Sequence, residues 1–264
     1  MSGAHPRTAV VTGADSGIGR ATAQLLATEG FDVGITFHTD EQGAQDTLRD
    51  VEQRGQRGFV AQQDLASPEA ADPVERLIGD LGSLGVLVNC GGTGVSDLAL
   101  DLKYDAWRQV VATDLDGPFL CAQAAARAMI RQGEGGRIIN VTSVHEHVPR
   151  VGSSAYCAAK AGLGMLTQVL ALELAEHNIL VNSVAPGEIA TEMTGHGTEE
   201  AYGIKRPGNP LGRAGHVNEV ASVIVFLASP RSAYVTGASY TVDGGLTQMA
   251  AHGHDSLDDG WRRP

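Results

Sequence analysis

Short apolar segments alternate with helical patterns along almost the whole chain, and this alternation restricts the fold more than any other feature. The apolar runs lie near residues 8–12, 32–37, 57–62, 85–89, 136–142, 179–184 and 238–242. Strands that alternate with helices usually pair in parallel. Most of these runs are continuously apolar, as expected of strands covered on both sides. The sequence therefore predicts an α/β fold, a single-domain, doubly wound, seven-stranded parallel sheet with helices on both faces.

A glycine-rich turn follows the first apolar run and leads directly into a helical pattern. It reads Thr12-Gly13-Ala14-Asp15-Ser16-Gly17-Ile18-Gly19. Glycine lets the chain turn tightly, so that backbone N–H groups and the positive end of a helix can approach a pyrophosphate. A strand, a glycine turn and a helix in this order indicate a dinucleotide site. The residues expected to bind it are Gly13, Asp15, Ser16, Gly17, Ile18 and Gly19.

Tyr156 and Lys160 lie four positions apart in a segment, 154–177, for which we expect a helix. Positions i and i+4 of a helix share one face, so the phenol and the ammonium can converge on a single point. A free tyrosine titrates near pH ~10, and a neighbouring cation favours its ionised form. Ser143, at the end of the fifth apolar run, can donate a hydrogen bond at the same point. Taken alone, a Tyr-x-x-x-Lys pair is more often an ordinary surface contact.

Further motifs follow the other apolar runs. They are Asp64-Leu65, Asn89-Cys90-Gly91-Gly92, Pro186-Gly187 followed by Thr191, and Asp243-Gly244-Gly245. Together with the glycine turn, Ser143 and Tyr-x-x-x-Lys, they occur in the order typical of the short-chain dehydrogenase/reductase family. The chain resembles this family over about residues 7–249. Within the family, Ser143-Val144-His145-Glu146 and Pro149 resemble the glucose 1-dehydrogenase branch, which lies close to the 3-oxoacyl reductases.

The resemblance implies hydride transfer between an NAD(P) cofactor and an alcohol or carbonyl compound. It makes Tyr156 the general acid or base, Lys160 the cation that favours the tyrosinate and binds the nicotinamide ribose, and Ser143 the orienting donor. Where the family usually has asparagine to hold a relay water, this chain has Asp114, which accepts but does not donate when ionised. We include Asp114 among the catalytic candidates. The implied cofactor site also contains Asp64, Leu65, Asn89, Gly91, Tyr156, Lys160, Pro186, Gly187, Ile189 and Thr191.

The end of the second apolar run bears on the choice of cofactor. NAD users generally place a carboxylate there, whereas NADP users place a basic or hydroxyl group. Here Phe37 occupies the acid position, His38 stands where arginine is common, and Thr39 can donate to a phosphate. Against this, His38 is largely neutral at pH 7 and Asp15 and Asp40 are acidic. We expect NADP(H) to be favoured over NAD(H).

The substrate is less constrained than the cofactor. We expect Ser143, His145, Tyr156 and Glu188 to meet it, although Glu188 could equally cap the next turn. A sugar or polyol is plausible, but an acidic residue of the glucose branch is missing at Thr93-Gly94-Val95, which disfavours glucose itself. The segment Glu192–Gly215 is rich in glycine and proline and is expected to be a mobile lid.

Composition and charge exclude several classes of partner. The net charge of −12, with scattered basic residues, disfavours nucleic acid. No apolar run reaches the ~20 residues that span a bilayer and no signal segment is evident, so we expect a cytoplasmic protein. Cys90, Cys121 and Cys157 lack Cys-x-x-Cys spacing, which predicts reduced thiols and no metal site. The length suits one domain, residues 1–250, with a polar tail, 251–264.

The resemblance further implies a homotetramer that acts on a small-molecule substrate. Two other functions stay open. One is a 3-oxoacyl-thioester reductase, which would need a basic patch for an acidic carrier protein. The other is a non-catalytic NADP(H)-sensing protein; Asp114 keeps it possible, while Ser143, Tyr156 and Lys160 argue against it.

Overall fold

The computed structural model describes residues 5–195 and 197–249 and shows one seven-stranded sheet. The strands are β1 Thr8–Val11, β2 Asp32–Phe37, β3 Gly58–Gln62, β4 Val86–Asn89, β5 Gly136–Val141, β6 Ile179–Pro186 and β7 Ser239–Val242. They lie in the order β3-β2-β1-β4-β5-β6-β7, and every pairing is parallel. The predicted sheet is confirmed.

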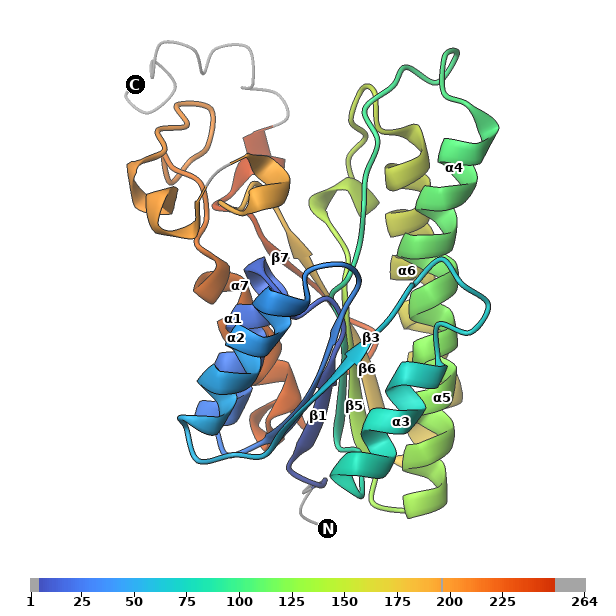
Figure 1. Cartoon of the computed structure of the whole chain (residues 1–264). Coiled ribbons are helices and arrows are strands. Elements are labelled where there is room, and N and C mark those ends of the chain that lie inside the picture. Colours follow the sequence, from blue (N-terminus) through green and yellow to red (C-terminus); the bar gives the residue numbers. More distant parts are fainter. Residues whose placement is uncertain (1–4, 196, 250–264) are drawn as a thin grey trace.

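Helices cover both faces of the sheet (Figure 1). One layer contains α1 Gly17–Thr28, α2 Glu41–Glu52 and α7 Val217–Ala228, and the other contains α3 Asp72–Leu81, α5 Gly117–Gln132 and α6 Ser154–Glu173, with α4 Tyr104–Val111 packed on α6. Neighbouring residues of β1 show why its run is continuously apolar: Val11 packs in the first layer's core and Val10 in the second.

The helix α6 is shorter than the segment predicted for it. It ends at Glu173, and a 3₁₀ turn, Ala175–His177, follows. Asn178 then adopts a left-handed conformation with φ of 56°, which ends the helical path. By length and composition α6 could cross a membrane, but it packs on β5 and β6 and buries Leu163, Thr167 and Ala171, as core helices do.

A π-helical turn, Ala112–Asp116, joins α4 to α5. Pro118, two residues beyond this turn, has no N–H to donate to the carbonyl of Asp114, so a regular α-helical bond is impossible there. Such widened turns are frequent at functional sites. This one carries Asp114 into the interior, where the residue is 0% exposed.

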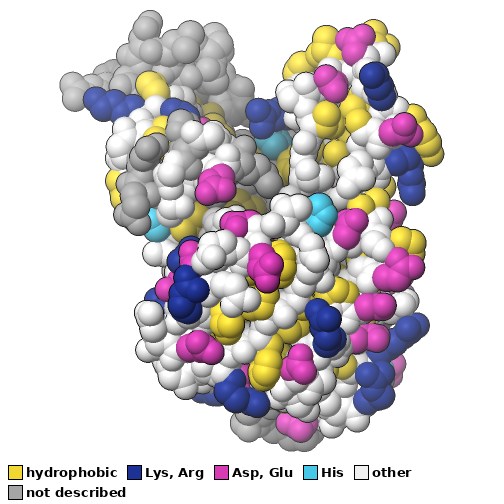
Figure 2. All heavy atoms as spheres, viewed as in Figure 1, with side chains coloured by type: hydrophobic (Ala, Val, Ile, Leu, Met, Phe, Trp, Pro, Cys, Tyr) yellow, Lys and Arg dark blue, Asp and Glu magenta, His cyan; other side chains and the backbone are white. Residues whose placement is uncertain are grey.

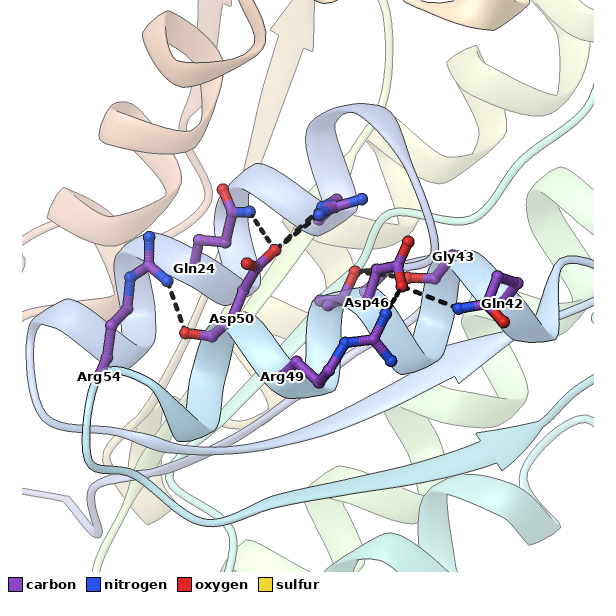
Figure 3. A network of polar contacts seen from close by, with 10 residues as sticks. Gln24, Gln42, Gly43, Asp46, Arg49, Asp50 and Arg54 are labelled. Atoms are coloured by element: carbon purple, nitrogen blue, oxygen red, sulfur yellow. Dashed lines mark hydrogen bonds and ion pairs between the residues drawn. The ribbon is translucent and has the colours of Figure 1, made fainter.

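Polar contacts fasten α2 to α1 and to the glycine turn. Asp50 of α2 accepts hydrogen bonds from Gln24 at 2.7 Å and from Arg20 at 2.8 Å (Figure 3). The hydroxyl of Thr47 donates to the carbonyl of Ala14 at 2.8 Å. The position of the turn after β1 is therefore fixed by a hydrogen bond from α2 as well as by the strand that precedes it.

The carboxyl ends of the strands meet at one edge of the molecule, where parallel sheets place their ligands. Figure 2 shows the surface hollowed at this edge, beside the projection that carries α4. Beyond β6 the chain forms two short 3₁₀ segments, Glu192–Thr194 and Thr198–Gly203, before it reaches α7.

Candidate active site

Glycine is required at several points where the turn after β1 meets the turn after β4. Gly13 and Gly17 have φ of 58° and 53°, in the left-handed region. A Cβ on Gly13 would lie 2.7 Å from the Cα of Gly91. The hydroxyl of Thr12 accepts hydrogen bonds from the N–H groups of Cys90, at 2.9 Å, and Gly91, at 3.1 Å. The two turns therefore interlock, backbone against backbone.

A cavity of about 590 Å³ opens beside the glycine turn. Its lining includes Asp15, Ser16, Gly17, Arg20, Asp40, Gly43, Glu192, Thr198 and His216. Ser16 precedes α1 but its side chain makes no capping hydrogen bond, so the first N–H groups of the helix are not capped by it. A methyl carbon of Thr191 would lie 3.5 Å from a Cβ on Gly17, which places the segment after β6 against the turn. This backbone cradle fits the pyrophosphate of a dinucleotide.

Tyr156 and Lys160 lie at the start of α6, as predicted. The Lys160 Nζ is 5.6 Å from the centre of the Tyr156 ring and donates to the carbonyl of Val141, at the end of β5, at 3.2 Å. Lys160 is only 4% exposed. Burial is the largest single effect and opposes the charged form, but Asp114, Tyr156 and Cys90 together outweigh it, so the Lys160 pKa is raised.

Asp114 is the buried ion-pair partner of Lys160. Its Oδ1 accepts a hydrogen bond from the N–H of Thr93 at 2.7 Å, and its Oδ2 lies 3.5 Å from the Lys160 Nζ. Burial raises the Asp114 pKa, while Lys160 and the Thr93 N–H act in the opposite direction. Sequence reasoning did not find Thr93, because nothing in the local pattern relates it to a residue 21 positions away.

His145 approaches Tyr156 from the 3₁₀ turn after β5, which Ser143 precedes. Ser143 is 5% exposed and caps the 3₁₀ turn Val144–Glu146, where its Oγ accepts from the N–H of His145 at 3.2 Å. The His145 Nδ1 lies 3.0 Å from the carbonyl oxygen of Val148, so Nδ1 carries the proton of that hydrogen bond. The His145 ring meets the Tyr156 ring edge-on, with centroids 6.3 Å apart. The structure therefore places His145 beside Tyr156, and Ser143 in the turn that packs on α6.

Residues 13–247 match a family model described as Enoyl-(Acyl carrier protein) reductase. The chain is 51% identical over 239 residues to an uncharacterized oxidoreductase, YohF, of Escherichia coli, covering 90% of this chain and 94% of that protein. It is 34% identical to Glucose 1-dehydrogenase 2 of Bacillus subtilis, covering 91% and 95%. The crystal structure of acetoin dehydrogenase YohF from Salmonella typhimurium superposes with a TM-score of 0.88 at 50% identity, covering 92% of this chain and 97% of that one.

The chain belongs to the short-chain dehydrogenase/reductase family. It is therefore an oxidoreductase that uses a nicotinamide cofactor and acts on a small molecule. The predicted resemblance to this family, including its glucose 1-dehydrogenase members, is confirmed.

In this short-chain dehydrogenase/reductase, the side chains of two residues predicted to bind the cofactor make hydrogen bonds within the protein. Asn89 is 2% exposed, and its side chain donates to Asn140, at 2.9 Å, and to the carbonyl of Pro118, at 3.1 Å. Asp64 accepts from the N–H of Ala66 at 2.9 Å. The remaining members of the predicted set line the strand ends: Leu65 packs against the backbone of Gly91, Gly187 lies against Asp243, and Ile189 is buried.

The segment after β2 leaves His38 and Thr39 exposed. The side chain of Asp40 accepts from the N–H of Gly43 at 3.0 Å and so caps α2. Burial raises the pKa of the nearby Asp15, and the carboxylates of Asp40 and Glu192 act in the same direction.

Glu188 makes an ion pair that the sequence did not reveal. The Arg206 Nε donates to both carboxylate oxygens of Glu188 at 2.8 Å. Farther along, Asn209 donates to the carbonyl of Asp243 at 2.9 Å, and Lys205 and Arg213 form an antiparallel bridge. Residues 205–213 are thus fastened to each other and to the end of β7.

Proposed function

We propose that this protein transfers hydride reversibly between NADP(H) and a small compound whose reacting carbon adjoins a hydroxyl-bearing carbon. The convergence of Tyr156 and Lys160 beside the Ser143 turn is the observation that carries the oxidoreductase chemistry. The names of the relatives support the substrate class. A solved structure with 50% sequence identity to this chain is named an acetoin dehydrogenase, and acetoin is a ketone with a hydroxyl group on the neighbouring carbon. Glucose 1-dehydrogenase 2 adds a hydroxyl-rich substrate in a more distant relative.

In the oxidation direction, Tyr156 removes the proton of the substrate hydroxyl group, and in reduction it returns that proton. Ser143 donates a hydrogen bond to the same oxygen and orients it. Lys160 has three N–H donors. The carbonyl of Val141 accepts from one, and Asp114 Oδ2 is an ion-pair partner 3.5 Å away, which leaves the ammonium able to donate to the ribose. When bound, the nicotinamide accepts or supplies the hydride. The interlocked glycine turns and the segment around Thr191 hold the cofactor in place.

The preference for NADP(H) is supported by the end of β2. Phe37 is buried there at 8% exposure, so no carboxylate stands at the position that usually binds a ribose 2′-hydroxyl. The carboxylate of Asp40 is engaged as the cap of α2, whereas Thr39 is exposed and can donate to a phosphate. Asp15 and Glu192 add negative charge at the cavity, so we expect the preference to be modest.

We further propose that residues 192–215 cover the substrate, within a domain spanning residues 1–250. Because residues 205–213 contact Glu188 and the end of β7, movement of the described part would be concentrated in the two 3₁₀ segments Glu192–Thr194 and Thr198–Gly203. The tail, 251–264, lies outside the described residues. Exposed apolar side chains on α4 and α6, such as Tyr104 at 73%, Met165 at 59% and Leu172 at 82%, support a homotetramer. Three free cysteines support a cytoplasmic location.

A second candidate function is the reduction of a 3-oxoacyl thioester. The description of the matching family model, which names an acyl carrier protein, favours it. The net charge of −12 argues against docking of an acidic carrier. The two candidates differ in substrate and share Ser143, Tyr156 and Lys160.

The test begins with separate titrations of the protein with NADPH and with NADH. Nicotinamide fluorescence is the readout and gives the two dissociation constants. Turnover is then measured with acetoin, a vicinal diol, the matching mono-alcohol, glucose and a 3-oxoacyl thioester. We expect tighter binding of NADPH and the highest kcat/KM with acetoin and the diol. Higher kcat/KM with the thioester would favour the second candidate. Cofactor binding without turnover of any compound would favour the sensing role.

A further inference from the structure

An ammonium and a carboxylate are buried together behind the catalytic tyrosine. The side chains of Lys160 and Asp114 are 5% and 0% exposed, and their charged atoms lie 3.5 Å apart. Asp114 Oδ2 has no hydrogen-bond partner among the described residues, so the ammonium is its principal electrostatic partner. A Cβ on Gly92 would lie 3.4 Å from both charged groups, which shows that the Gly92 backbone covers the pair.

Among the described residues, few other titratable groups face this pair. Tyr156 approaches Lys160 from α6 itself, and Cys90 approaches from the turn after β4. Burial raises the Cys90 pKa to about 12, so its thiol is neutral at ordinary pH. His145, in the turn after β5, contacts the Tyr156 ring edge-on. Asp114 is therefore the acidic group that offsets the lysine charge.

We propose that Asp114 is a positioning residue whose carboxylate neutralises the buried Lys160 ammonium and so moves the working pH range of Tyr156 upward. The inference rests on the proposed function, because it concerns the proton that Tyr156 exchanges with substrate. A lone ammonium favours the tyrosinate strongly, whereas an ammonium paired with a carboxylate presents almost no net charge. An asparagine at this position would leave the ammonium uncompensated.

The direction of the effect follows from the charges. Removing the carboxylate charge leaves Lys160 as a net cation, which favours ionised Tyr156 and lets alcohol oxidation begin at lower pH. The same change removes the group that keeps Lys160 protonated, so the alkaline loss of activity also moves to lower pH. At an effective dielectric constant of ~20, a unit charge within about 12 Å shifts a pKa by at least roughly one unit, so the pH profile is expected to shift by at least that much.

The experiment measures kcat/KM for oxidation of the best diol against pH in the intact protein and in Asp114→Asn. The matched control is Asp116→Asn, which removes one negative charge from the same π-helical turn. Asp116 is exposed and lies 3.9 Å from Arg108 on the surface. We expect both limbs of the profile to move down by at least roughly one unit in Asp114→Asn, and not in Asp116→Asn, whose charge water screens.

An unmoved or upward-shifted profile in folded Asp114→Asn would overturn the proposal, because it would mean that the carboxyl group carries no charge while the enzyme works. If Asp114→Asn does not fold, Asp114→Ser removes the same charge with a smaller side chain, and the same shift is expected. An equal shift in Asp116→Asn would assign the effect to overall charge and would also overturn the proposal. Failure of the proposed function is distinct, because the intact protein would then have no profile.

Discussion

Two ion pairs at the carboxyl end of the sheet differ in burial more than in chemistry. Lys160 and Asp114 are 3.5 Å apart and almost completely buried, whereas Arg206 and Glu188 are hydrogen-bonded at 2.8 Å with about a third of each side chain exposed. Arg206 and Glu188 are closer together, but their pair contributes less to stability because water screens their charges. A buried pair cannot lose one partner without stranding a charge. Burial, more than distance, decides which pair affects the chemistry.

The largest effect is expected from breaking the buried pair. Lys160→Met leaves Asp114 buried without its cation, which we expect to lower the free energy of unfolding by about 3 kcal/mol near pH 7 and to abolish turnover. An isolated buried carboxyl group has a raised pKa, so the folded form binds more protons than the unfolded form and stability falls as pH rises. Denaturant unfolding of Lys160→Met from about pH 5 to pH 8 measures this slope.

The control for this variant is the double change Lys160→Met with Asp114→Asn, which removes both charges. We expect it to recover most of the lost stability and none of the turnover. A double variant as unstable as Lys160→Met would show that packing of the lysine stem, and not the charge pair, carries the stability.

A second partly exposed pair, Arg213 and Glu219, sharpens the comparison, because its carboxylate also accepts a hydrogen bond from the N–H of His216. Their side chains are 26% and 38% exposed, and hydrogen bonds from Arg213 are the main cause of a Glu219 pKa of about 2, below its ordinary 4.5. A lowered carboxyl pKa stabilises the fold above pH 4.5, and the contribution is lost as pH falls toward 2. After allowance for solvent screening, we expect Glu219→Gln to cost about 1 kcal/mol near neutral pH.

Thermal unfolding of Glu219→Gln and the intact protein from neutral pH downward tests this expectation. The difference in Tm should shrink as pH falls below about 4.5. Glu176→Gln serves as the control, because that side chain is 80% exposed beside His177. A difference that is independent of pH would mean that Glu219 acts only as the cap of α7.

The smallest effect on stability is expected at the exposed pair near the site. Glu188→Gln should change the free energy of unfolding by less than about 1 kcal/mol, and added salt should reduce the difference further. Its consequence should appear in KM for substrate, because Arg206 then holds residues 205–213 less firmly. Steady-state kinetics at low and high salt separate the two effects. A loss of stability as large as that of Lys160→Met would contradict the ranking by burial.

Local sequence patterns were sufficient to predict the sheet and the placement of Tyr156 beside Lys160. The parallel strands follow from continuous apolar runs, and the meeting of Tyr156 with Lys160 follows from their helical spacing. The glycine turn was equally evident, because its positive φ angles demand glycine.

Contacts between distant segments could not be predicted in the same way. The bond from Thr93 to Asp114 and the pair of Arg206 with Glu188 depend on how separate loops meet after folding. For Asn89, the sequence motif was evident but the contacts of the side chain were not. The Asn89 side chain joins β4 to β5 and α5.

The most direct test of the account compares the intact protein with Tyr156→Phe, using acetoin and the preferred cofactor. The account predicts that kcat falls by at least about 10²-fold, as expected when a general acid or base is removed, while nicotinamide fluorescence shows nearly unchanged cofactor binding. Turnover that survives in Tyr156→Phe would contradict the account, because another group would then be moving the proton.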